Sequence, residues 1–129
     1  MSAFVATVTS NIMINWMTAQ ATPAATATRY ITIYNGDPQG TGTEVISTVT
    51  GSSTRPSITF AAASGGSASS NATVTFTTNA AGGATVDHVA IMTAATSGNI
   101  MASAAVTSKT ITAGDSLSIA SGNATVQIS

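Results

Sequence analysis

The sequence predicts an all-β fold: an antiparallel β-sandwich or jelly roll of about eight strands, with a short N-terminal helix. Three observations predict this class. Short segments alternate between apolar and polar residues, turn signals separate them at intervals of about 8–14 residues, and no helical pattern lies between the strands. A parallel α/β sheet would need such helices. We therefore expect a helical arm and linker over residues 1–27 and a β-sandwich domain over residues 28–129.

The N-terminal arm carries a helical pattern. Phe4, Val8, Ile12 and Trp16 recur at every fourth residue, as they would on one face of an amphipathic helix. Several β-branched residues at its start lower the helix propensity, so an early strand is the alternative. We expect this stripe to cover the domain's own core, with docking onto a neighbouring subunit as the alternative. For Trp16, a core anchor and an interface anchor are equally compatible with the pattern.

After the linker, each segment of alternating apolar and polar residues predicts a strand. The predicted strands are residues 28–34, 44–50, 58–62, 72–77, 86–92, 100–106, 109–112, 116–119 and 124–128. Turn signals separate most of them, among them the Asn-Gly-Asp-Pro run at residues 35–38. Residues 63–70 are rich in Gly, Ser and Ala, which predicts a loop.

The chain is unusually poor in charge. Only seven of its 129 residues are Lys, Arg, Asp or Glu, and Thr, Ala, Ser and Gly fill 76 positions, whereas an ordinary domain carries roughly 25% charged residues. The net charge of -1 and the absence of a basic cluster argue against binding to nucleic acid or to a membrane surface. Because a near-neutral surface promotes association, we expect the chain to work inside an assembly.

Few residues could carry chemistry. His88 is the single histidine and follows Asp87, but successive strand residues point to opposite faces, so we expect no catalytic dyad; a pH-sensitive contact is the milder option. Asn35, Asp37 and Glu44 lie close in sequence without the spacing of a calcium loop, which favours a turn. With no cysteine and one histidine, a zinc site from one chain is not credible. We expect no enzyme activity, catalytic residue, cofactor or metal.

The scarce large and charged side chains are the candidates for subunit contacts. The chain has only three Lys and Arg side chains. We therefore expect at least one of them to form an intersubunit ion pair, although such pairs contribute little to stability when they are exposed. His88 has a polar tip that suits a contact between subunits. The interface candidates are Phe4, Ile12, Trp16, Arg29, Arg55 and His88.

The second half of the chain carries sequence runs of a known kind. They are Val86-Asp87-His88-Val89-Ala90-Ile91-Met92, then Ala94 to Ala102, then Lys109-Thr110-Ile111-Thr112-Ala113-Gly114-Asp115-Ser116-Leu117. These runs resemble a group of small virion proteins of tailed phages, described as tail-fibre or capsid-associated proteins. The resemblance extends over about residues 30–128, and departs from the group's pattern at Thr93 and at Gly98-Asn99. It implies a structural role without catalysis.

Composition and resemblance together predict a phage virion protein. The main hypothesis is a capsid decoration, or cement, protein on the outer surface of the head. It would be a trimer that bridges capsomers and binds the major capsid protein, stabilising the assembled shell by mass action. The alternative is a fibre, baseplate or adaptor subunit of the tail. A third hypothesis, from another class, is a module that binds a host glycan through Tyr30 and Tyr34, which share a strand face.

Overall fold

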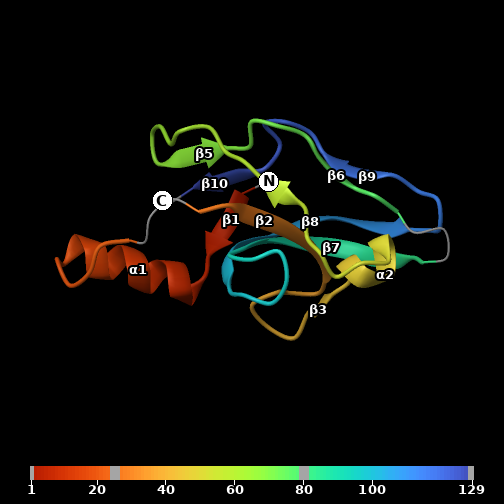
Figure 1. Ribbon diagram of the computed structural model, residues 1–129, viewed down its shortest axis with the longest axis horizontal. Coiled ribbons are helices and arrows are strands. Elements are labelled where there is room, and N and C mark those ends of the chain that lie inside the picture. Colours follow the sequence, from red (N-terminus) through yellow and green to blue (C-terminus); the bar gives the residue numbers. More distant parts are fainter. Residues whose placement is uncertain (1, 24–26, 79–81, 128–129) are drawn as a thin grey trace.

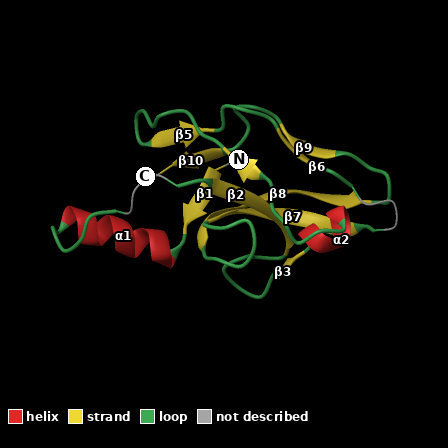
Figure 2. Cartoon of the chain, viewed as in Figure 1, coloured by secondary structure: helices red, strands yellow, loops and turns green. Residues whose placement is uncertain are grey.

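The computed structural model of the protein describes residues 2–23, 27–78 and 82–127. Within these ranges the chain forms ten strands and two short helices, and the strands dominate the cartoon (Figure 1, Figure 2). The predicted class, an all-β sandwich with a short N-terminal helix, is confirmed. Neither of the two described helices has the length and apolar character needed to cross a membrane.

The elements follow one another along the chain in this order: β1 (Ser2–Val5), α1 (Thr7–Met17), β2 (Arg29–Asn35), β3 (Thr43–Glu44), α2 (Ile46–Thr50), β4 (Ser57–Ile58), β5 (Ser67–Ser69), β6 (Val74–Phe76), β7 (Ala84–Met92), β8 (Ile100–Ile111), β9 (Leu117–Ile119) and β10 (Thr125–Gln127). The long strands β2, β7 and β8 are the centre of the molecule. Their sequences match the predicted segments most closely, because each combines strict alternation with β-branched residues.

The main sheet has the strand order β3-β2-β7-β8-β1-β10-β5, and β4 pairs with β2 beside β3. Its pairs are antiparallel with one exception, since β1 runs parallel to β10. The strands β6 and β9 form a separate antiparallel pair, which Figure 1 shows at a distance from the long strands. The sandwich therefore consists of one long, curled sheet and a small second sheet.

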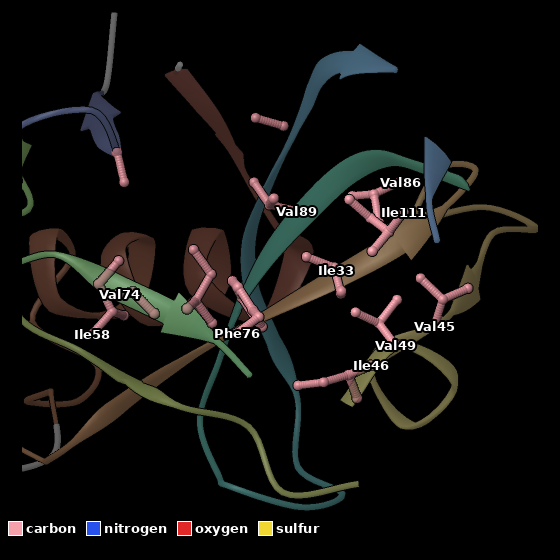
Figure 3. Close-up of a cluster of buried hydrophobic side chains, with 13 residues drawn as sticks. Ile33, Val45, Ile46, Val49, Ile58, Val74, Phe76, Val86, Val89 and Ile111 are labelled. Carbon is pink, nitrogen blue, oxygen red and sulfur yellow. The ribbon is translucent and has the colours of Figure 1, made fainter. Parts of the chain in front are cut away.

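The core lies between the long strands and this small sheet. Ile33 of β2, Val89 of β7 and Ile111 of β8 belong to one buried cluster with Phe76 of β6 (Figure 3). Phe76 is 1% exposed and is the largest fully buried side chain of the described residues. Because many strand residues are Ala, Thr or Ser, a few large side chains carry most of the apolar burial.

One predicted strand is partly a helix. Residues 44–50 were expected to be extended, yet the strand β3 ends at Glu44 and the helix α2 follows. Ile46 and Val49 are three residues apart and both buried, so helical geometry brings both into the core. Gly51 then ends the helix in the left-handed conformation with φ 74°. A run of only seven residues does not distinguish the two periods, which is why the sequence-based prediction was wrong here.

Three further differences concern strand limits. β1 at the N-terminus confirms the alternative of an early strand before the helix. β5 lies inside residues 63–70, which were predicted to be a loop. The predicted strands 100–106 and 109–112 are a single strand, β8, because the backbone pairs with β7 on both sides of a register shift. Small polar residues such as those of β5 carry almost no strand signal, and only pairing with β10 makes this segment a strand.

Candidate interaction surface

Among the described residues, hydrogen bonds join the helix α1 to the sheet at its first turn. The Ala6 N–H donates to the Met101 carbonyl at 2.9 Å, and Thr9 Oγ1 donates to the same oxygen at 2.7 Å. Beyond this turn the helix extends away from the strands, as Figure 1 shows. No residue of α1 is buried. The expectation that this helix covers the domain's own core is therefore wrong.

The predicted stripe lies on the exposed part of this helix. Val8, Ile12 and Trp16 are 40%, 38% and 60% exposed, and each is one turn after the previous one. We call these three residues the α1 stripe. Ile14 and Met17, on other sides of the helix, are 55% and 73% exposed. Within the described part of the chain, every large apolar side chain that is exposed belongs to α1. Such a concentration of apolar surface marks an interaction site.

Phe4, the first residue of the predicted pattern, lies on β1 and not on the helix. Its backbone is paired with Ser103 of β8. The side chain of Phe4 lies outside the described residues. The four-residue spacing that predicted one helical face therefore begins on a strand and continues on a helix.

Arg55 is enclosed within its own chain. Its side chain is 6% exposed, and its guanidinium donates two hydrogen bonds to the Glu44 carboxylate, from Nε at 2.7 Å and from Nη2 at 2.9 Å. Nη1 donates to the carbonyls of Ala94 and Ser97 at 3.0 and 2.6 Å. Thr32, which is fully buried on β2, also donates to Glu44. Because the charge is neutralised inside the chain, this geometry does not suit the expected intersubunit ion pair.

The ion pair sets the electrostatics of this region. Burial by itself would raise the pKa of Glu44, but the hydrogen bonds from Arg55 and Thr32 and the charge of Arg55 together hold this pKa below its ordinary value. The hydrogen bond with Glu44 raises the pKa of Arg55. Burial, and then the nearby Glu44 charge, raises the pKa of Tyr34. The pair therefore stays ionised and Tyr34 stays neutral across the physiological pH range.

Arg29 occupies a different place. It is the first residue of β2, is half-buried, and pairs in register with Ile58 of β4. With Thr28, Thr59 and Phe60 it lines a shallow open depression. Arg29 is thus far closer to solvent than Arg55, and its role as an interface candidate stays a prediction.

His88 and Asp87 meet, contrary to the expectation that they point to opposite faces. His88 Nδ1 lies 2.8 Å from Asp87 Oδ1, which also accepts the Gly36 N–H at 2.7 Å. The pairing of β7 with β8 is irregular between Val86 and His88, because β8 has extra residues opposite this point, and such a bulge disturbs the regular geometry of the paired strands. The hydrogen bonds from His88 and Gly36 lower the pKa of Asp87. The pair joins the turn after β2 to β7.

The strand face beside α1 is hollowed into an open groove. Thr7 and Val8 of α1 form one side, and Tyr34, Gln39 and Asn99 contribute polar groups. Gln39 Nε2 donates to Ser103 Oγ at 2.6 Å. In the described ranges no three His, Cys, Asp or Glu side chains lie close enough together to hold a metal ion. The groove offers contact surface and hydrogen-bonding groups, and it adjoins the α1 stripe at Val8.

Sequence reasoning missed the Glu44–Arg55 network and Gln39. Glu44 and Arg55 are opposite charges on either side of α2, in a chain with seven charged residues. The rarity of charged residues was the available signal, since a partly buried ion is seldom left without a partner of opposite charge. Nothing in the sequence pattern distinguished Gln39 from the other polar residues of its loop.

Comparison with protein families places the chain. A family described as "Podophage GP4 fiber I protein gp80" matches residues 4–127. The match begins within β1 and includes α1 and the strands β2 to β10, so it covers nearly the whole sequence. No curated protein matches the chain.

Proposed function

We propose that this chain, which belongs to the podophage GP4 fibre I family and is thus a structural protein of the phage virion, forms part of a fibre on the tail. The observation that carries the proposal is the extent of the family match, from residue 4 to residue 127. It includes both the helix with its exposed stripe and the sandwich. The proposed role is mechanical, with no catalytic step.

The strand surfaces fit a role inside an assembly. The exposed residues near the end of β8 are mostly hydroxyl side chains, with Lys109 as the single charge among residues 107–110. On the small sheet, Thr75 of β6 and Ser118 of β9 are both exposed and paired in register. Such faces can be buried against another subunit without removing an unpaired ion from water. This favours permanent contacts over reversible binding by a free monomer.

Decoration of the capsid, our main expectation from the sequence, is now the second candidate. The family is one of fibre proteins, and this favours the tail alternative. Low charge and a β-sandwich fit both places equally well, so neither property discriminates between head and tail. Binding to the major capsid protein and a trimeric state stay predictions.

The glycan-binding hypothesis also stays a prediction. Tyr30 and Tyr34 lie on the same face of β2, opposite Met92 and His88 of β7, and both are half-buried. A sugar-binding aromatic needs an open ring face. We expect Tyr30→Ala and Tyr34→Ala to leave attachment to host cells unchanged if the chain has only a structural role in the fibre.

The test is the copy number in purified virions. The chain is quantified by mass spectrometry against the major capsid protein and against a known tail protein in the same particles. A fibre subunit should be present in a few to a few dozen copies and should co-purify with detached tails. Hundreds of copies, retained on tailless heads, would overturn the proposal and return the chain to the capsid surface.

A further inference from the structure

Among the described residues, none buries the α1 stripe, and all three of its side chains stay exposed. Val8 and Ile12 are about 40% exposed, and Trp16, at the end of the helix away from the first turn that is tied to β8, is 60% exposed. We propose that the α1 stripe is the surface that binds a second copy of this chain, with α1 packing against α1. The proposal deepens the fibre function by naming where copies meet, and it does not depend on head or tail placement.

The start of the helix is fixed to the sheet, which limits the directions in which its later turns can extend. β1, which precedes it, is hydrogen-bonded between β8 and β10. Thr9 and Ala6 then tie the first turn to Met101. A surface held in its bound geometry loses less conformational entropy when a partner binds. The stripe therefore differs from a loose N-terminal tail that would have to fold on its target.

The absence of charge on the arm favours a second copy as the occupant. The first 28 residues contain no Asp, Glu, Lys, Arg or His. In the groove beside the stripe, Arg55 is the single charged lining residue, and Glu44 already neutralises it. A partner with a charged surface would lose hydration here without gaining an ion pair. An identical stripe brings neither that cost nor the like-charge repulsion that symmetric copies of a charged surface would suffer.

The size of the surface sets the expected strength. An eleven-residue helix is about 16 Å long. One face of so short a helix buries less area than the roughly 800 Å² per partner that stable interfaces bury. Two isolated copies should therefore associate weakly, at micromolar concentrations or above. In a fibre, several such contacts between linked copies would add avidity.

The experiment uses Trp16, the single tryptophan of the chain, as its own reporter. The purified full chain is diluted from millimolar to submicromolar concentration, while sedimentation gives the mass and fluorescence gives the Trp16 emission. We expect an oligomer at high concentration, a monomer on dilution, and a red shift of Trp16 emission that follows the same curve. A monomer with solvent-type emission at all concentrations would overturn the proposal.

A matched pair of variants tests the surface itself. Ile12→Ser alters the stripe, and Ile14→Ser alters an exposed isoleucine about 200° away around the same helix. We expect Ile12→Ser to raise the dissociation constant roughly tenfold or more and Ile14→Ser to leave it nearly unchanged. Circular dichroism checks that both remain folded. Equal weakening by both variants would overturn the assignment to the stripe.

Two further results bear on the occupant. A monomer whose Trp16 emission shifts only with neutral phosphatidylcholine vesicles would overturn the second-copy proposal in favour of a lipid surface. Self-association that depends on Ile12, together with hundreds of copies on virion heads, would keep this proposal while rejecting the tail placement. The failure of one proposal is therefore distinguishable from the failure of the other.

Discussion

At the scale of single residues, the pairing of Arg55 with Glu44 joins three parts of the fold. Glu44 ends β3 and accepts a hydrogen bond from Thr32 on β2, while Arg55 reaches the loop after β7 through the carbonyls of Ala94 and Ser97. Removing one partner of a buried pair leaves an uncompensated ion, which costs more than the pair contributes. Two of the seven charged residues are therefore used for architecture.

We predict that Arg55→Met lowers the free energy of unfolding by about 3 kcal/mol, the lower end for buried pairs because Glu44 keeps some contact with solvent. Urea denaturation of the two proteins measures this difference. Lys109→Met, at an exposed position, is the matched control and should change it by less than about 0.5 kcal/mol. Equal effects of the two variants would contradict a structural role for the pair.

The same pair predicts a dependence of stability on pH. The folded pKa of Glu44 is lowered, so its contribution is present above the ordinary glutamate pKa and is lost as pH falls through the lower folded value. We expect the midpoint of thermal unfolding to fall in acid, below the ordinary glutamate pKa. Glu44→Gln should flatten this acid slope. An unchanged slope in Glu44→Gln would mean that other carboxylates cause the loss.

At the scale of elements, the loop between β2 and β3 depends on the close approach of two glycines. A Cβ on Gly42 would lie 2.4 Å from the carbonyl carbon of Gly36, a distance that the backbone cannot accept. Gly36 itself has φ 89°, where other residues are strained. The loop is also joined to β7, because the Gly36 N–H donates to Asp87. Its shape therefore determines where Gln39 and the adjoining groove lie.

We predict that Gly42→Ala destabilises the protein by about 2 kcal/mol, because the loop must open to accept the new methyl group. Gly40→Ala is the matched control in the same loop, since its Cβ would be no closer than 3.4 Å to Asp37. Its effect should stay below about 1 kcal/mol. Thermal unfolding of both variants measures the two effects. If Gly40→Ala destabilises the protein as much as Gly42→Ala does, the close backbone approach is not the cause.

At the scale of the whole molecule, the N-terminal arm is built into the sandwich. β1 pairs with β8 through Phe4 and Val5, and with β10 through Ser2 and Ala3. It thereby connects the long strands to the β10-β5 end of the sheet. The helix that follows is an outward extension of this connecting strand. The arm thus has two roles, a strand that completes the fold and a helix available for contact.

We predict that removing residues 1–27 lowers the midpoint of thermal unfolding by more than about 10 °C, since β8 and β10 lose their common partner. Ile14→Ser, which leaves β1 in place, should have little effect. Differential scanning calorimetry of the three proteins measures the change. A truncated chain that unfolds at the same temperature as the full chain would contradict this role of β1.

The sequence by itself determined the fold class, the long strands and the low charge that indicates an assembly. These properties depend on local patterns: alternation in β2, β7 and β8, turn residues between them, and the rarity of ions. The fibre family also matches the sequence directly, over residues 4–127. Local signals of this kind can be recognised without knowing which segments pack together, because each residue's own chemistry produces them.

Only the tertiary structure decided where the short segments go and which polar groups meet. β5 exists because β10 pairs with it, and α2 exists because two buried residues three apart must face one core. Asp87 meets His88 where the pairing of β7 with β8 is irregular, and Arg55 pairs with Glu44 within its own chain. The outward course of α1 also follows from β1 being held in the sheet. Each of these depends on contacts between distant residues, which a local pattern cannot contain.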